Sequence, residues 1–291
     1  MNQPMTRLKS LLKLENVTKS FQSKRSLFSR TFAEHTALKD ISLDIYDGRF
    51  VGICGESGAG KSTLARILID LDQNYEGVIH SYKKNIKKSI VFQNPFASMN
   101  PKRTIMSNMT IGLVDTVELR EELDRLLVQL QLDRKLISKY PHECSGGQLQ
   151  RFAIARALLN KPDLLICDEI LSSLDPSIQL QMIDVIKKLK KTSITIVFIS
   201  HDLPVLKFLS DDIMVLYKGY CVESGSAEHV LQNPFHPYTI SLIENSRLSL
   251  NDQSGGCVFS QKCPVATDQC FKQAPSRKYI SNESHDYLCI L

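Results

Sequence analysis

Residues Gly55 to Ser62 carry the strongest chemical signal of the sequence, the pattern G-x-x-x-x-G-K-S. An apolar run over 50–54, typical of a buried strand, precedes it, and a helical pattern follows it to about Leu71. Glycines let backbone N–H groups approach phosphate oxygens without a Cβ in the way, and the helix N-terminus adds positive potential. We therefore predict a phosphate-binding loop, in which Lys61 reaches the β- and γ-phosphates and Ser62 binds Mg²⁺. The residues expected to hold the nucleotide here are Gly55, Glu56, Ser57, Gly58, Ala59, Gly60, Lys61, Ser62 and Thr63.

Two acids follow a second apolar run, Leu164 to Cys167. Ligands of open α/β sheets bind beyond the carboxyl ends of the strands, so both carboxylates are expected to emerge near the phosphates. We predict that Asp168 holds Mg²⁺ and that Glu169 is the general base that polarises the attacking water. His201 follows another strand-like run, 194–199, and is therefore placed to contact the γ-phosphate.

A third element is the sequence S-G-G-Q, Ser145 to Gln148, at the start of a helical pattern over 149–159. Ser145 is a good N-cap residue, and Gly146 and Gly147 have no side chains to cover the backbone N–H donors. We therefore predict a second anion site at this helix N-terminus. On its own, this short match is equally typical of a plain helix start. This segment lies far from the phosphate loop in the sequence. The chain therefore carries two separate helix N-termini that could each bind an anion.

The elements that position these residues alternate between strands and helices. This alternation indicates right-handed crossovers and a largely parallel sheet, so the predicted fold class is α/β. The apolar residues between Thr116 and Leu132 recur at helical spacing among charges, which predicts an amphipathic helix. The other expected elements are strands over 12–21, 50–54, 164–167 and 194–199, an apolar segment over 37–45, helices over about 61–71, 149–159 and 177–190, an exposed basic loop over 22–34 and a linker over 251–256.

The composition limits the class of protein. The 291 residues include 36 Lys and Arg against 31 Asp and Glu, a net charge of +5 that is too small and too scattered to indicate nucleic acid binding. A hydrophobic content of 43% fills a sizeable core and excludes disorder for most of the chain. No apolar run approaches the ~20 residues that cross a bilayer, and the N-terminus is too polar for a secretory signal. We therefore expect a soluble protein that stays in the cytosol.

Taken together, the motifs resemble those of the ATP-binding subunit of an ABC transporter, in the expected order over residues 12 to 225. The resemblance implies a P-loop NTPase core of the ABC ATPase type with an inserted helical subdomain, and a short cysteine-rich C-terminal extension. The implied domains are 1–246, with the helical subdomain over about 94–162, and the extension over 247–291. The matching segments are the phosphate loop 55–63, Gln93-Asn94-Pro95 at the Q-loop, Cys144 to Gln148 at the signature, Leu164 to Glu169 at the Walker B strand, Ser173-Leu174-Asp175 at the D-loop and His201 at the switch histidine.

The resemblance also implies roles for individual residues. Phe21 stacks on the adenine, and Gln93 joins Ser62 and Asp168 as a ligand of Mg²⁺ and links that site to the helical insertion. Two cassettes of the family face each other head to tail, so that the signature of one covers the nucleotide held by the other. The implied cofactors are ATP and Mg²⁺.

Two positions depart from the family pattern. Cys144 stands where the family usually has Leu, and Ile170 stands where Pro or Ala is preferred after the acid. Cysteine is apolar and smaller than leucine, so we expect looser packing before the signature without loss of its anion site. We expect little effect of Ile170 on the acid itself.

Two segments resemble the peptide and nickel importer branch of the family. Asn94 to Pro101 resembles that branch's segment after the Q-loop, and Pro234 to Thr239 resembles its His-Pro-Tyr-Thr element. The latter is also typical of an ordinary Pro-bounded turn before a helix. Its local role does not follow from the sequence.

The eight cysteines fall into two groups. Cys54, Cys144, Cys167 and Cys221 are dispersed and are expected to be small buried hydrophobic residues. The spacing of the other four is C-x5-C-x6-C-x18-C without a C-x-x-C pair, which fits a zinc ribbon poorly. In relatives such a tail ligates a [4Fe–4S] cluster, and thiolates suit that role. Zinc and free thiols stay open as alternatives for the candidate ligands Cys257, Cys263, Cys270 and Cys289.

The implied function is ATP hydrolysis that energises the import of di- or oligopeptides. Import of nickel or a metal chelate stays open, because the cassette does not touch the cargo. A soluble ABC-type ATPase that acts on nucleic acid or ribosomes is a third possibility, but such proteins usually carry two cassettes or long coiled-coil insertions. A regulatory module without turnover is disfavoured, because both Glu169 and His201 are present.

The implied partners follow from the importer architecture. They are a second, non-identical ABC ATPase subunit, two membrane permease subunits and an extracytoplasmic solute-binding protein, with no nucleic acid. The expected location is peripheral, at the cytoplasmic face of the cell membrane.

Overall fold

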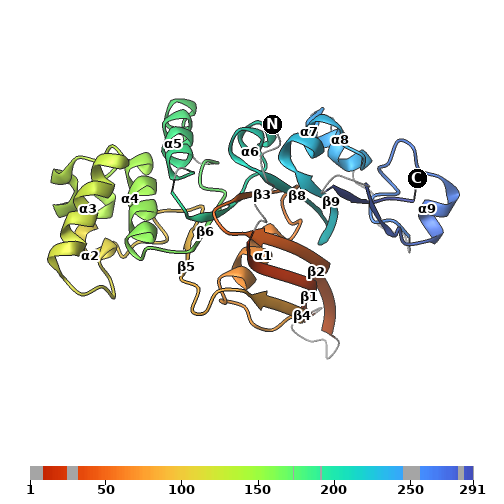
Figure 1. Ribbon diagram of the computed structural model, residues 1–291, viewed down its shortest axis with the longest axis horizontal. Helices are drawn as coiled ribbons and strands as arrows, with labels where there is room; N and C mark the ends of the chain where they lie inside the picture. Colours follow the sequence, from red (N-terminus) through yellow and green to blue (C-terminus); the bar gives the residue numbers. More distant parts are fainter. Residues whose placement is uncertain are drawn as a thin grey trace, which may run out of the picture. The chain divides into compact units, whose positions relative to one another are not determined.

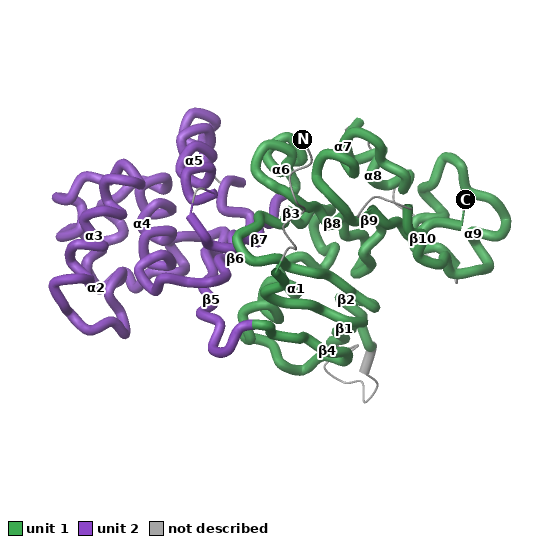
Figure 2. Tube along the Cα trace, in the orientation of Figure 1, with its two compact units in different colours: residues 1–82, 201–291 green, residues 83–200 purple. Residues whose placement is uncertain are grey.

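The computed structural model describes residues 9–24, 32–172, 174–190, 192–244, 256–280 and 285–290. The chain divides into two compact units, of which unit 1 comprises residues 1–82 and 201–291 and unit 2 comprises residues 83–200 (Figure 2). Three predicted features fall outside the described residues: Ser173 of the D-loop, most of the linker over 251–256, and the boundary between residues 246 and 247.

Unit 1 is built on a mainly antiparallel sheet with the strand order β4-β1-β2-β9-β8-β3 (Figure 1). The pairs β1–β2, β1–β4 and β8–β9 are antiparallel, whereas β3–β8 and β2–β9 are parallel. β11 pairs with β9 and with β10, so the end of the chain joins the same sheet. The strands are β1 (Ser10–Lys24), β2 (Phe32–Tyr46), β3 (Phe50–Cys54), β4 (Glu76–Ser81), β8 (Asp212–Tyr217), β9 (Tyr220–Ser226), β10 (Arg277–Tyr279) and β11 (Asp286–Leu288).

The prediction of a largely parallel sheet is wrong for unit 1. A parallel pair needs a crossover connection of about a dozen residues or more, but only residues 25–31 separate β1 from β2, and the two strands pair antiparallel. Both strands also extend into the segment 22–34 that was predicted as an exposed loop, because cross-strand backbone hydrogen bonds form whatever the side chains are. Residues 25–31 of that segment lie outside the described part of the chain.

The helices of unit 1 are short. α1 follows the predicted phosphate loop and ends at Leu68 rather than at Leu71, because Asp70 has the left-handed φ of 62° that ends a helix. The helices described in this unit are α1 (Lys61–Leu68), α6 (Leu203–Leu209), α7 (Ala227–Gln232), α8 (Pro237–Ile243) and α9 (Asp268–Lys272).

Unit 2 confirms the parallel arrangement that the alternation predicts. Its strands β5 (Lys88–Val91), β6 (Leu164–Asp168) and β7 (Thr195–Ile199) pair parallel in that order. Every residue of β6 and β7 is buried, which explains why both segments are continuous apolar runs. The helical elements of this unit are α2 (Ile105–Met109), α3 (Val117–Gln129), α4 (Gly146–Leu159), α5 (Pro176–Leu189) and the 3₁₀ helices Arg134–Ser138 and Pro141–Glu143.

The amphipathic helix predicted over 116–132 is confirmed as α3. The Thr116 hydroxyl accepts a hydrogen bond from the Leu119 amide and so caps the first turn. Leu123, Leu126 and Leu127 are buried on one face. Spacing of three and four residues places these side chains together, as the sequence pattern indicates.

Two expectations from composition can also be checked. Cys54, Cys144, Cys167 and Cys221 are all buried and free, as predicted. Within the described ranges, none of the helices is both long and apolar enough to cross a membrane.

Candidate nucleotide-binding site

The predicted phosphate loop lies in unit 1 between β3 and α1. Its glycines have the backbone geometry that the motif requires, because Gly60 has a φ of 102° and a Cβ there would lie 2.5 Å from the carbonyl oxygen of Ala37. Gly58, with a φ of 81°, has no heavy atom within 4 Å of the position of a Cβ. The loop is therefore packed tightly against Ala37 at Gly60, whereas it has open space beside Gly58.

Lys61 begins α1 and is only 4% exposed. Its Nζ donates to the carbonyl oxygens of Gly55, at 2.8 Å, and Glu56, at 3.0 Å, so the ammonium group lies over the loop. Ser62, the next residue of the helix, is exposed. The loop thus combines a fixed cation, a hydroxyl and the N-terminus of a helix, which together suit a phosphate group.

Two other segments of unit 1 form hydrogen bonds with the backbone of the loop. The Gly219 amide, between β8 and β9, donates to the carbonyl oxygen of Ala59 at 3.0 Å. The hydroxyl of Tyr238, in α8, accepts a hydrogen bond of 2.9 Å from the Glu56 amide. The sequence singled out the element that contains Tyr238 but not this contact, because no local pattern connects two residues that are 182 positions apart.

Phe21 and His201 are the other predicted nucleotide-binding residues in unit 1. Phe21 lies on β1 opposite His35, and its side chain is 41% exposed. The Nζ of Lys19 lies 4.9 Å from the centre of the Phe21 ring, within the range of a cation–π contact. His201 is exposed just before α6.

The predicted acids end strand β6 of unit 2. Asp168 is the last residue of the strand and is 9% exposed. Glu169 follows it with a φ of 48°, an uncommon backbone conformation for glutamate. Its amide donates to the carbonyl oxygen of Ile199 at 3.0 Å, so the backbone of this acid is tied to the end of β7.

Gln93 and Glu169 come together in unit 2. The Gln93 Nε2 donates to the Glu169 Oε2 at 3.4 Å and to the Ser172 Oγ at 3.0 Å. The Ser172 hydroxyl donates in turn to the backbone carbonyl of Glu169 at 2.9 Å. The sequence singled out Gln93 and Glu169 individually but predicted neither their contact nor the part of Ser172, since a lone serine after a strand carries no signal of its own.

The predicted signature forms the N-terminus of α4 as a capping box. The Ser145 hydroxyl accepts from the Gln148 amide at 3.3 Å, and the Gln148 Oε1 accepts from the Ser145 amide at 3.0 Å. A Cβ on Gly147 would lie 2.8 Å from the Cγ2 of Ile178 in α5, so the two helices approach closely here. Gly146 faces open space instead and lines a cavity of about 420 Å³ together with Gln93.

The predicted site residues are thus distributed between the units. The phosphate loop, Phe21 and His201 belong to unit 1, whereas Gln93, the signature and both acids belong to unit 2.

The four cysteines of the C-terminal extension are close enough to influence one another. Burial raises the pKa of the Cys263 thiol, and the charges of Cys289, Cys257 and Cys270 raise it further. The Cys257 amide also donates to the carbonyl oxygen of Cys270 at 2.8 Å. Even so, the described residues contain no group of three or more His, Cys, Asp or Glu side chains arranged to hold a metal ion.

The sequence is also similar to known proteins. Residues 38–172 match the ABC transporter family, and residues 222–247 and 243–270 match the oligopeptide/dipeptide transporter C-terminal region. The "Oligopeptide transport ATP-binding protein OppF" of Haemophilus influenzae is 36% identical over 96% of both chains. The chain belongs to the ABC transporter ATP-binding proteins. As such, it is an ATP-hydrolysing transport ATPase that uses ATP and Mg²⁺.

Further relatives and solved structures agree with this assignment. The ATP-binding protein AppF of Bacillus subtilis, named for oligopeptide transport, is 36% identical over 97% of both chains, and the dipeptide transport protein DppF of Haemophilus influenzae is 34% identical over 91% of this chain and 92% of its own. The structure of the ATP-binding cassette MJ0796 bound to ADP and Pi has a TM-score of 0.64 and 29% identity, over 74% of this ABC ATPase and 98% of that chain. The fold is therefore the mixed α/β P-loop NTPase fold of ABC cassettes.

Proposed function

We propose that this ABC ATPase hydrolyses ATP to drive the import of di- or oligopeptides through a membrane transporter. The observation that carries the proposal is the similarity, over nearly the whole chain, to ATP-binding proteins named for peptide transport. The match at residues 222–247 and 243–270 to the C-terminal region of peptide transporters supports it. OppF, AppF and DppF are ATP-binding proteins named for peptide transport, so peptides are favoured over nickel or a metal chelate as the cargo.

The proposed assembly places this chain at the cytoplasmic face of the membrane as a peripheral subunit. Its proposed partners are a second, non-identical ABC ATPase, two permease subunits and a solute-binding protein outside the membrane. Residues 94–162 are the proposed docking segment for the permeases. Arg156 of α4 donates to the carbonyl oxygen of Ser98 at 2.6 Å, and the buried Asn108 side chain bonds Asn100, so the start of this segment is held rigidly.

In unit 1, the proposed role of residues 55–63 is to bind the phosphates of ATP. Lys61 already lies over the loop, from which its four-carbon side chain can reach the β- and γ-phosphates. The exposed ring of Phe21 suits stacking on the adenine. His201 is proposed to contact the γ-phosphate.

Mg²⁺, when bound, neutralises charge on the phosphate oxygens. The proposed ligands are Ser62, Gln93 and Asp168, which offer the oxygen donors that this cation prefers. The Nε2 of Gln93 is engaged by Ser172 and Glu169, which leaves its Oε1 as the ligand atom.

Glu169 is the proposed general base that polarises the attacking water. Its backbone is fixed through Ile199 and Ser172, and its carboxylate is held by Gln93. A general base has to stand within hydrogen-bond reach of the water that it activates, so this fixed position supports the role.

Ser145, Gly146, Gly147 and Gln148 are proposed to cover the nucleotide held by the second ATPase subunit. The capping box fixes the first turn of α4, whose N-terminus suits an anion. Closure of two cassettes would exclude water from the phosphates, and that movement would be transmitted to the permeases.

For residues 247–291, we propose a cysteine-rich C-terminal extension in which the four cysteines are ligands of a [4Fe–4S] cluster. Four thiols are the ligands that such a cluster requires. The described side chains are not in a metal-binding arrangement. We assign the cluster no part in ATP hydrolysis. Visible absorbance and a brown colour of the anaerobically purified chain test the proposal. Colourless protein without iron would contradict it.

Peptide-dependent transport tests the proposed function. The chain, its ATPase partner and the permeases, reconstituted in vesicles with the solute-binding protein, should take up peptide only with ATP. Lys61→Ala should abolish uptake, because the loop loses its only side-chain cation. Uptake of nickel in place of peptide, or unchanged uptake with Lys61→Ala, would contradict the proposal.

A further inference from the structure

The His-Pro-Tyr-Thr element, which the predicted chemistry left without a role, touches the phosphate loop. Pro237 and Tyr238 begin α8, and the Tyr238 side chain is completely buried. Its hydroxyl accepts a hydrogen bond of 2.9 Å from the amide of Glu56, the second residue of the loop. That bond fixes the peptide plane between Gly55 and Glu56 and so orients the beginning of the loop.

The ring of Tyr238 is one of three aromatic rings packed together behind the loop. Its centre lies 4.5 Å from the ring of Tyr217, at the end of β8, and 5.5 Å from the ring of Phe259, in the extension. The rings of Tyr217 and Phe259 are 5.3 Å apart at 88°. All three side chains are almost completely buried, so the extension supplies one wall of the packing that holds Tyr238.

The backbone of the element is held by a buried carboxylate. Glu223 of β9 is 0% exposed and accepts hydrogen bonds from the amides of Phe235, at 2.8 Å, and His236, at 3.1 Å. The Nε2 of His285, in the extension, lies 2.7 Å from the same carboxylate. The extension therefore reaches the element through the Glu223 carboxylate as well as through Phe259.

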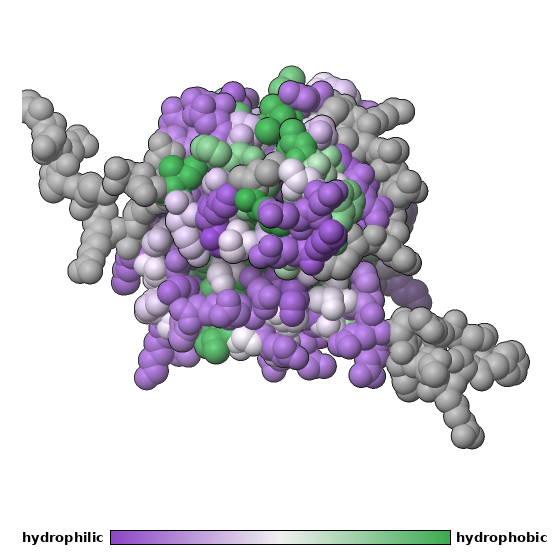
Figure 3. Space-filling view, turned by 90° about the vertical axis from the view of Figure 1, so that its right-hand side faces the viewer, coloured by the Kyte–Doolittle hydropathy of each residue, from purple (hydrophilic) through white to green (hydrophobic). Residues whose placement is uncertain are grey.

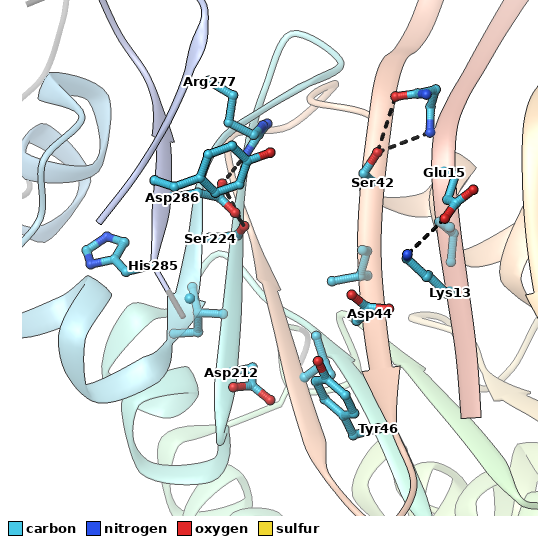
Figure 4. Close-up of a pocket in the computed structure, with 17 residues that line it drawn as sticks. Lys13, Glu15, Ser42, Asp44, Tyr46, Asp212, Ser224, Arg277, His285 and Asp286 are labelled. Carbon is cyan, nitrogen blue, oxygen red and sulfur yellow. Dashed lines mark hydrogen bonds and ion pairs between the residues drawn. The ribbon is translucent and has the colours of Figure 1, made fainter. Parts of the chain in front are cut away.

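The extension is itself bound to the sheet of unit 1. β11 pairs with β9, and Arg277 forms an ion pair with Asp286 and donates to the carbonyl oxygen of Cys221 at 2.6 Å. Figure 4 shows Arg277, Asp286 and Ser224 on one side of a cavity of about 550 Å³ and the pair of Lys13 and Glu15 on the other.

Figure 3 shows a face of the molecule on which the coloured residues are mostly hydrophilic and the hydrophobic ones form small scattered groups.

We propose that Tyr238 is a positioning residue for the phosphate loop, and that the C-terminal extension holds it in place through Phe259 and His285. This inference rests on the proposed function, because it takes the loop to be the ATP site. The extension then sets the affinity for ATP without touching the nucleotide.

The variant Tyr238→Phe tests the hydrogen bond alone, because it removes the hydroxyl and keeps the ring. Loss of one neutral hydrogen bond to the loop should raise the Kd for MgATP by about fivefold, measured by titration calorimetry on the purified full chain. The ATPase rate at saturating ATP should stay within about twofold, because no reacting group is removed. Tyr287→Phe, which deletes a hydroxyl on β11, is the matched control and should bind MgATP like the wild type.

A second variant tests the contribution of the extension. Phe259→Leu keeps an apolar side chain but loses the ring contacts with Tyr217 and Tyr238, and it should raise the Kd for MgATP in the same direction. A purely structural role would lower the melting temperature of both variants and leave their Kd values unchanged, which would overturn the inference.

The Lys61→Ala variant separates this inference from the proposed function. If Lys61→Ala loses MgATP binding and Tyr238→Phe binds as the wild type does, the positioning role is wrong and the ATP site stands. If Lys61→Ala binds MgATP normally, the loop is not the ATP site, and both proposals fall.

Discussion

At the scale of the residue, hydrogen bonds to the backbone determine where the chemical groups lie. Glu169 takes an uncommon left-handed conformation, which costs conformational energy and persists only where neighbours hold it. The bonds to Ile199 and Ser172 supply that restraint, and Gln93 holds the carboxylate. The acid is therefore positioned by protein groups on its backbone and on its carboxylate.

The buried His236 makes stability depend on pH. Burial lowers the pKa of His236 from its usual 6.5 to about 4, although the neighbouring Glu223 carboxylate raises it. The folded chain thus keeps this imidazole neutral where the unfolded chain binds a proton, so stability is lost as the pH falls from 6.5 towards 4. We expect the free energy of unfolding to fall by about 1.5 kcal/mol between pH 6.5 and pH 5 from this group alone.

Urea unfolding at the two pH values measures that change. His236→Asn is the matched variant, because its side chain offers an acceptor for the Tyr238 amide but does not titrate. It should show a smaller fall by about the same 1.5 kcal/mol. Equal falls in the variant and the wild type would assign the pH dependence to other groups.

At the scale of the element, the positions of single strands and helices could be predicted from the sequence, but the pairing of the strands could not always be. The sequence located the phosphate loop, β6, β7 and α3 to within a few residues. Buried strands are written as continuous apolar runs, and amphipathic helices have apolar residues at a spacing of three and four. The antiparallel pair of β1 and β2 was not predicted, since strand pairing depends on which backbone edges meet. The parallel pairing of β6 and β7 was predicted, because a helix separates these strands along the chain, whereas β5 and the strand order were not.

The close approach of α4 and α5 gives a prediction at the same scale. A methyl group on Gly147 would meet the Cγ2 of Ile178 at 2.8 Å, whereas one on Gly146 would meet nothing within 4 Å. Gly147→Ala should therefore be less stable than Gly146→Ala by about 1–3 kcal/mol, because only the first overpacks the helix contact. Thermal unfolding of the two variants measures the difference, and equal melting temperatures would show that the helices separate without cost.

At the scale of the whole molecule, the order of the motifs along the sequence was sufficient to predict the family. It did not predict the distant residues that pack against the phosphate loop. The predicted ABC ATPase fold is confirmed by the solved cassettes that this chain resembles. The bond between Tyr238 and Glu56 spans 182 positions, and the contact of Phe259 with both tyrosines comes from the extension. Such long-range packing leaves no periodic or local pattern, so only the structure reveals it.

The central claim is that a triphosphate is held by the loop of one ATPase subunit and closed in by the signature of the other. The most direct measurement is the structure of Glu169→Gln, with its ATPase partner, in complex with MgATP. We expect Lys61 on one triphosphate, and Ser145 and Gly147 within hydrogen-bond distance of the triphosphate that the partner holds. A closed complex in which residues 145–148 lie far from every triphosphate would contradict the account.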